Sequence, residues 1–302
     1  MKTNLKELKE KKTIKELLEF GILNIDKSSG PTSFDISDFV RKTLSLKKTS
    51  HFGTLDPKVT GVLPIALNRA CKLTGFFIGE DKEYVGIMRI HEDLEIEKIR
   101  EAITKNFKGI IKQTPPVKSR VKRQEREREI KVFEILEKEG QDILFRVVCQ
   151  GGTYIRKLVH DLGIYLKCGA HMLELRRTRA GIFKEESDLE NPGPMINLYD
   201  FERIVKDFQK DPKENEAALK EIIIPGEIIS ELYPIVQIKD EYVEKILHGS
   251  PIHYSHLINP EDKKNDWRFC AFNKEKFMGI YEVTSEGEIF ARPQFVLQPI
   301  ES

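Results

Sequence analysis

The chain has 302 residues, of which 39% are hydrophobic, so it exceeds one average domain and predicts one large domain plus a smaller one. Lys and Arg total 50 against 49 Asp and Glu, and this net charge of +1 excludes a uniformly basic chain, so any nucleic-acid surface must come from local segregation of charge. No apolar run is long enough to span a bilayer, and the Lys-rich start lacks the apolar centre of a secretory signal, which predicts a soluble intracellular protein without a membrane partner.

The cysteines are scattered, with no Cys-x-x-Cys pair and no histidine at metal-ligand spacing. This pattern predicts thiols in a reducing compartment and no metal site. They are Cys71, Cys149, Cys168 and Cys270.

The first elements follow from local signals. We expect residues 1–12, mostly Lys, Glu and Leu, to fray or to lie on the surface. The capping box that starts at Thr13 predicts a short helix through Phe20. A strand over residues 22–25 then leads through a turn to a helix capped by Thr32 or Ser33, which runs to about Leu44.

A carboxylate, Asp56, stands in a stiff loop. It precedes Pro57 and lies between Gly53 and Gly61, in front of the apolar run 62–67, which predicts a buried strand. Pro57 forces Asp56 out of helical backbone angles. Such a loop can hold one acid in a fixed direction over a cleft, although taken alone an Asp-Pro turn is common.

The middle of the chain contains its most basic stretch. A strand over residues 84–90 is followed by an amphipathic helix, capped by Asp93, that runs to Phe107. A diproline at 115–116 then precedes seven cations within residues 118–131. By itself this stretch predicts a solvated charged face, whereas clustered cations also suit the phosphates of a nucleic acid.

The remaining elements alternate strands with turns. A strand over residues 143–149 turns at Gly151 and Gly152 into a helix beginning near Thr153. Residues 185–233 predict surface helices and a linker. Beyond Pro234 we expect short strands at 236–238, 268–272, 279–283 and 295–297, with one helix over 240–247.

Four segments, in this order, resemble the motifs of the TruB and dyskerin family of RNA pseudouridine synthases. They are DKSSGPTS at 26–33, GTLDPKVTGVL at 53–63, GTYIRKLVHDLG at 152–163 and GAHMLELRRTRAG at 169–181. The first departs from the family pattern because Ser28 stands where proline is common. The diproline and the basic stretch resemble the dyskerin branch, and the C-terminal strands look like a PUA domain, a small RNA-binding β-barrel.

The resemblance implies a role for each matching residue. Asp56 matches the catalytic aspartate, Arg156 the arginine that pairs with it, and Tyr84 the active-site tyrosine, which would stack on a flipped uracil. Leu175 would close the base pocket, and His51 would contact RNA or the space left by the flipped nucleotide. Arg176 and Arg177 would combine packing with phosphate contact. Further phosphate contacts are expected from Lys118, Arg120, Lys122 and Arg123.

Two roles are possible for Lys27. Taken alone, it is expected to be a solvated surface lysine. If it lies beside Asp56, it would stabilise the loop or contact a phosphate. Without the resemblance, Tyr84 and Leu175 predict only core packing.

The implied fold is an α+β pseudouridine synthase fold. It has a mixed, mainly antiparallel central sheet flanked by helices, plus a small C-terminal PUA-like β-barrel. The expected parts are an N-terminal extension at 1–20, a catalytic domain at 21–232 and a PUA-like RNA-binding domain at 233–302.

The implied reaction converts uridine in rRNA or tRNA to pseudouridine and needs no cofactor or metal. In one alternative the chain is the catalytic subunit of a box H/ACA ribonucleoprotein, with a guide RNA and with zinc-binding, β-barrel and kink-turn-binding protein subunits. In a second it acts alone on the T-loop uridine of tRNA, and in a third it is a non-catalytic RNA-binding scaffold. The absence of long Lys-rich tails favours an archaeal, cytoplasmic protein.

Overall fold

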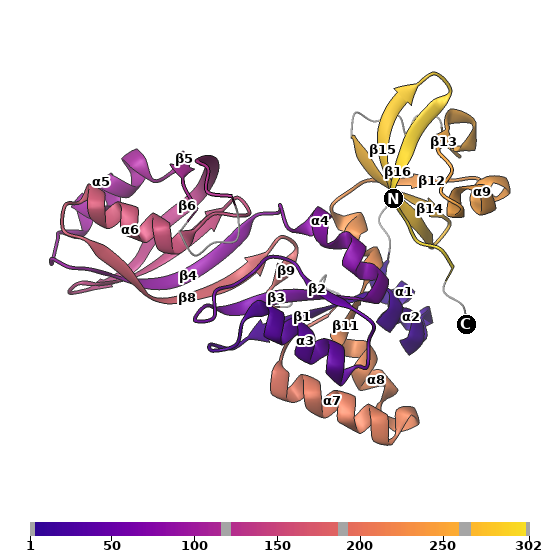
Figure 1. Ribbon diagram of the computed structural model, residues 1–302, viewed down its shortest axis with the longest axis horizontal. Coiled ribbons are helices and arrows are strands. Elements are labelled where there is room, and N and C mark those ends of the chain that lie inside the picture. The colour runs from indigo at the N-terminus through magenta and orange to yellow at the C-terminus, as the bar shows by residue number, and fades with distance from the viewer. Residues whose placement is uncertain (1–3, 116–121, 187–192, 260–266, 300–302) are drawn as a thin grey trace.

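The structure, a computed structural model, describes residues 4–115, 122–186, 193–259 and 267–299. Two β-sheets organise these residues (Figure 1). The larger is a mixed, mainly antiparallel sheet flanked by helices, and the smaller is a curled C-terminal sheet of five strands in the described residues. This arrangement confirms the predicted α+β fold class.

In the described residues the larger sheet has the strand order β10-β1-β3-β8-β4-β7-β6-β5, with β11 beside β1, β2 beside β3 and β9 beside β8. Two of its pairs, β1 with β10 and β3 with β8, are parallel. Its strands are β1 (Gly21–Lys27), β2 (Thr49–His51), β3 (Thr60–Leu67), β4 (Lys82–Ile90), β5 (Gly109–Gln113), β6 (Arg126–Glu139), β7 (Asp142–Cys149), β8 (Ala170–Ala180), β9 (Phe183–Lys184), β10 (Met195–Asn197) and β11 (Ile223–Pro225).

Helices cover one face of this sheet. Buried apolar side chains of α3, α5, α6, α7 and α8 form one core with side chains of β1, β3, β4 and β7. The α-helices are α1 (Leu5–Lys11), α2 (Ile14–Glu19), α3 (Ser33–Thr43), α4 (Thr74–Phe77), α5 (Ile96–Asn106), α6 (Ile155–Tyr165), α7 (Leu198–Lys210), α8 (Pro212–Ile222) and α9 (Val243–Leu247). The 3-10 helices are η1 (Asn68–Leu73), η2 (Gly226–Glu231), η3 (Asp240–Tyr242) and η4 (Tyr254–His256).

The smaller sheet packs beside the larger one. Its order is β12-β14-β15-β16-β13, formed by β12 (Ile235–Gln237), β13 (Ile252–His253), β14 (Arg268–Asn273), β15 (Lys276–Glu286) and β16 (Ile289–Val296). A second core joins the two sheets, and in it Phe20 stacks on Phe277 and Phe295 with ring centroids 5.6 and 5.9 Å apart. The sequence did not predict β13, which has only two residues.

Most predicted elements are confirmed, with one correction. Thr13 and Thr32 each form a capping box, at the starts of α2 and α3. Residues 5–11 do not fray but form α1, which lies on the surface, the other expected alternative, with Leu5 as its buried residue. Asp93 caps no helix: α5 begins at Ile96, and Asp93 instead accepts an ion pair from Lys138 at 2.6 Å.

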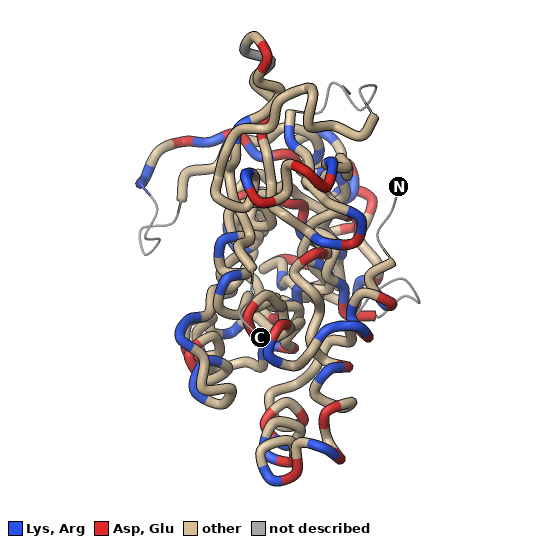
Figure 2. Tube along the Cα trace, turned by 90° about the vertical axis from the view of Figure 1, so that its right-hand side faces the viewer, with Lys and Arg blue, Asp and Glu red and all other residues tan. Residues whose placement is uncertain are grey.

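Charge is distributed along the whole described chain. Figure 2 shows basic and acidic residues interspersed over both sheets and their helices. Within the described ranges, no helix is long and apolar enough to cross a membrane.

Candidate active site

The Asp56 loop, residues 52–59, joins two antiparallel strands, β2 and β3. Leu55 and Val59 are buried and anchor it to the core that the helices cover. Gly61, just after the loop, has a φ of 98°. A Cβ at this position would lie 2.2 Å from the carbonyl oxygen of Arg177, so only glycine allows β3 to approach β8 here.

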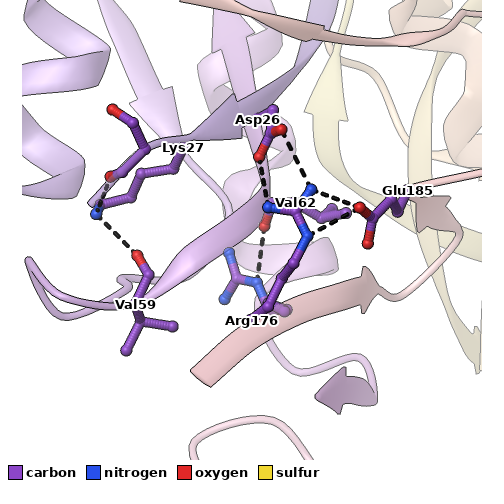
Figure 3. A network of polar contacts seen from close by, with 8 residues as sticks. Asp26, Lys27, Val59, Val62, Arg176 and Glu185 are labelled. Atoms are coloured by element: carbon purple, nitrogen blue, oxygen red, sulfur yellow. Dashed lines mark hydrogen bonds and ion pairs between the residues drawn. The ribbon is translucent and has the colours of Figure 1, made fainter. Parts of the chain in front are cut away.

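Lys27, at the end of β1, holds the loop through hydrogen bonds to its backbone. It is fully buried, and its Nζ donates to the carbonyl oxygens of Ser28, Pro57 and Val59, each at 2.9 Å. Figure 3 shows the bond to Val59. Burial lowers the pKa of Lys27, and the charge of Asp56 acts in the opposite direction. The prediction of a solvated surface lysine is therefore wrong, and burial leaves no face for a phosphate, so Lys27 fits its other predicted role, stabilising the loop.

Gly30, in the turn before α3, and Ser33, the first residue of α3, also hold the loop, and the sequence analysis gave neither a role there. The Ser33 hydroxyl accepts from the Leu55 amide at 2.8 Å and donates to the Leu55 carbonyl at 3.1 Å. The amide of Gly30 donates to the Pro57 carbonyl at 2.9 Å. Both lie in the first motif, so their place in it was the available signal.

Asp56 and Arg156 meet at the surface. The Nη1 of Arg156 donates to Oδ2 of Asp56 at 3.0 Å, and the side chains are 66% and 54% exposed respectively. Arg156 is the second residue of α6, so its position is fixed by the turn at Gly151 and Gly152. The guanidinium orients the carboxylate and leaves its other oxygen free to face a substrate.

Tyr84 and Leu175 lie on neighbouring strands, β4 and β8. The register places Tyr84 opposite Arg177 and Gly86 opposite Leu175. A Cβ on Gly86 would approach a methyl group of Leu175 to 2.9 Å, so this glycine makes room for the leucine. Since alternate strand residues share a face, Leu175 and Arg177 point to the same side of the sheet.

Arg177 is a buried connector between three elements. Only 1% exposed, it donates from Nε to the Val62 carbonyl at 2.8 Å and from Nη2 to the Gly53 carbonyl at 3.1 Å. The register also places it opposite Tyr84 on β4. Burial excludes the predicted phosphate contact of Arg177, whereas its predicted packing role fits this position.

Tyr84 is buried, with 8% of its surface exposed. Burial raises the pKa of Tyr84, and although the charge of Arg177 opposes this rise, the phenol stays protonated at neutral pH.

Arg176 faces the opposite side of β8. It donates to Asp26 at 3.0 Å and to Glu185 at 2.5 Å, as Figure 3 shows. Hydrogen bonds to Glu185 and then to Asp26 raise the pKa of Arg176. Two carboxylates thus compete with any phosphate for this guanidinium.

Of the other predicted RNA contacts, His51 ends β2 and directly precedes the Asp56 loop. His51 is half-buried with Nε2 3.1 Å from the Thr54 hydroxyl, and burial lowers its pKa, as does the charge of Arg177. Lys122 and Arg123 are exposed ahead of β6, whereas Lys118 and Arg120 lie outside the described residues.

The sequence analysis also missed Lys82. This residue is 4% exposed and donates from Nζ to the carbonyl oxygens of Phe77, Ile78 and Glu80. Burial lowers the pKa of Lys82 to about 8, with a further contribution from the charge of Arg177. Its place two residues before Tyr84 was the available signal.

Comparison with known proteins shows which family this chain resembles. The chain matches the TruB family pseudouridylate synthase N-terminal domain over residues 41–155 and the tRNA pseudouridylate synthase B C-terminal domain over residues 156–230. A probable tRNA pseudouridine synthase B of Pyrococcus abyssi is 41% identical over 97% of this chain and 86% of its own length. That of Methanopyrus kandleri is 43% identical over 83% and 72%.

Two solved structures are similar over nearly the whole chain. A Cbf5-Nop10-Gar1 complex contains a chain that is 36% identical with a TM-score of 0.84, covering 96% of this chain and 89% of its own. An H/ACA ribonucleoprotein bound to a substrate RNA contains one that is 34% identical with a TM-score of 0.82, at the same coverage.

The fold and these relatives define an RNA pseudouridine synthase, an enzyme of the isomerase class. The chain belongs to the TruB family of pseudouridylate synthases.

Proposed function

We propose that this chain converts uridine in RNA to pseudouridine with Asp56 as its essential acid. The observation that carries the proposal is the exposed Asp56–Arg156 pair, at 3.0 Å, on a loop held by the buried cations Lys27 and Arg177. In this reaction the bond from ribose C1′ to N1 of uracil breaks and a bond from C1′ to C5 forms, while C5 loses its proton and N1 gains one. The product is an isomer, so nothing is consumed.

Each residue then has a defined task. Asp56 acts by covalent attack or by proton abstraction from the ribose, and both roles fit an oriented carboxylate. Tyr84 stacks on the flipped base and offers its hydroxyl hydrogen, while Leu175 excludes water from one side. Lys27, Arg177 and Lys82 hold the backbone and do not touch RNA, whereas His51, Lys122 and Arg123 contact RNA directly.

We assign residues 21–232 to catalysis and residues 233–302 to RNA binding by a PUA-like barrel, with 1–20 as an extension. The catalytic subunit of a guide-RNA ribonucleoprotein is the favoured context, because the two structures compared above are H/ACA or Cbf5 assemblies. The partners would be a guide RNA with a zinc-binding, a β-barrel and a kink-turn-binding subunit. The free cysteines of this chain are compatible with the reducing cytoplasm, where we place it.

A second candidate is a stand-alone tRNA enzyme, which the names of the curated relatives favour. The test measures pseudouridine in a transcribed tRNA treated with wild-type or Asp56→Asn protein, first without and then with an H/ACA guide RNA and the partner proteins. Product only with guide and partners supports the ribonucleoprotein, whereas product from the chain alone supports the tRNA enzyme. Absence of any Asp56-dependent product contradicts both.

A further inference from the structure

Trp267, the single tryptophan of the chain, lies immediately before β14 with 59% of its surface exposed. The guanidinium carbon of Arg268 lies 3.7 Å from the centre of the Trp267 ring. The cation therefore covers one face of the indole, while the residue as a whole keeps 59% of its surface exposed. An exposed indole with a cation behind it has a surface ready for a further planar group.

Arg268 is held in place by helix α4 and by the smaller sheet. Its guanidinium also lies 5.3 Å from the ring centre of Phe76, in α4, and 3.4 Å from the carboxylate of Glu282, in β15. Phe76 in turn packs edge-on against Tyr233, with ring centroids 6.0 Å apart. These contacts pre-organise the Trp267–Arg268 stack at the junction between α4 and the smaller sheet.

The same helix leads to the Asp56 loop. Phe77, next to Phe76, stacks on Phe52 with ring centroids 4.8 Å apart. Ile78, which is 47% exposed, lies 4.0 Å from where a Cβ of Gly53 would be. A continuous series of contacts therefore connects the stack to the loop that carries Asp56.

We propose that Trp267 and Arg268 form a nucleobase-stacking site, in which an unpaired RNA base lies on the open face of the indole. A base needs only one ring face and stacks regardless of its identity, and the cation behind the indole favours both the base and its phosphate. The inference rests on the proposed function, which supplies RNA as the ligand. It adds a contact at the junction between α4 and the smaller sheet, away from Asp56.

The single tryptophan makes this site directly measurable. Full-length Asp56→Asn protein is titrated at fixed salt with two probes, single-stranded oligo(rA) and an unmodified tRNA transcript, while indole fluorescence is recorded. We expect quenching that saturates at the RNA concentrations at which filter binding saturates. Trp267→Ala should weaken RNA binding roughly 5- to 100-fold, the range for one lost base stack, and Trp267→Phe should retain most of the affinity.

Tyr199→Ala is the matched control, because Tyr199 is also exposed, at 76%, but lies on α7. It should bind RNA as wild type does. Unchanged fluorescence at saturating RNA, or wild-type affinity of Trp267→Ala, would overturn the stacking site even if Asp56-dependent pseudouridine formation persists. Conversely, quenching without pseudouridine formation by wild-type protein on any RNA would contradict the proposed function and support the stacking site.

Discussion

Arg156 and Asp56 form an exposed ion pair, and exposed pairs of this kind contribute about 0–1 kcal/mol to stability. Their proximity thus has little value for folding. A substitution here can separate the orientation of the acid from the integrity of the fold.

Arg156→Ala should lower the rate of pseudouridine formation by roughly 10- to 1000-fold, because the Asp56 carboxylate loses the charge that orients it. The free energy of unfolding should change by less than about 1 kcal/mol. Single-turnover assays and urea denaturation measure the two quantities. Lys157→Ala is the control: its neighbouring side chain pairs with Asp161 within α6 and should leave the rate near wild type. An equal loss in both variants would assign Arg156 to helix stability.

At the residue scale, the sequence predicted which side chains belong together but not always which way they point. Motif positions place Asp56 beside Arg156, and the structure brings them together. Burial was harder to predict, because a lysine is exposed in most contexts, and the burial of Lys27 is offset by the carbonyl oxygens that converge on it. Arg176 and Arg177 could have been separated from sequence, since strand alternation alone sends them to opposite faces.

At the scale of elements, the Asp56 loop depends on cations that touch only backbone. Lys27→Met should lower the free energy of unfolding by about 1–3 kcal/mol, because it leaves the carbonyls of Ser28 and Val59 without this donor. The Pro57 carbonyl still accepts from the Gly30 amide. The rate should fall as well, since the loop that carries Asp56 loosens.

Lys58→Met provides the control for Lys27→Met, because Lys58 is in the same loop but exposed. Urea denaturation and turnover of both variants form the measurement. Wild-type stability and rate in Lys27→Met would show that the three hydrogen bonds do not hold the loop.

Lys82, whose Nζ binds the carbonyl oxygens at the end of α4, makes a pH-dependent contribution to the free energy of unfolding. Its pKa is about 8 in the folded protein and 10.5 ordinarily, so the unfolded chain binds this proton more tightly. The free energy of unfolding should therefore rise with pH as the folded state releases the proton, by about 2 kcal/mol between about pH 7.5 and about pH 10. Lys82→Met should lack this rise. The difference between the two proteins in urea denaturation isolates it from other titrating groups, and parallel pH profiles would contradict the assignment.

Strands and caps were predictable because they follow local periodicity and side-chain chemistry, as the capping box at Thr13 illustrates. The α1 helix was not, because Leu5 is stabilised by burial in the core shared by the two sheets. That contact lies far along the chain and leaves no local signal. The helix α5 likewise shows that a good capping residue, Asp93, can be drawn to another partner, Lys138.

At the scale of the molecule, the N-terminal segment ties the two sheets together. Lys12 donates to Glu227 at 2.7 Å, and the two side chains are only 12% and 4% exposed. Nearby, Lys11 pairs at 2.8 Å with Glu275 in the turn between β14 and β15, but these side chains are 50% and 62% exposed. One segment thus forms both a buried and an exposed ion pair.

Lys12→Met should destabilise the whole protein by about 3–5 kcal/mol, since it leaves the Glu227 carboxylate buried without its cation. Lys11→Met should cost less than about 1 kcal/mol, because water replaces its exposed pair. Thermal unfolding followed by circular dichroism compares the two, and the Lys12→Met, Glu227→Gln double variant should recover part of the loss.

Because the core around Phe20 is shared, we expect one unfolding transition for both sheets. Two separated transitions in the wild type would mean that the sheets unfold independently, and the Lys12–Glu227 pair would then stabilise only their junction.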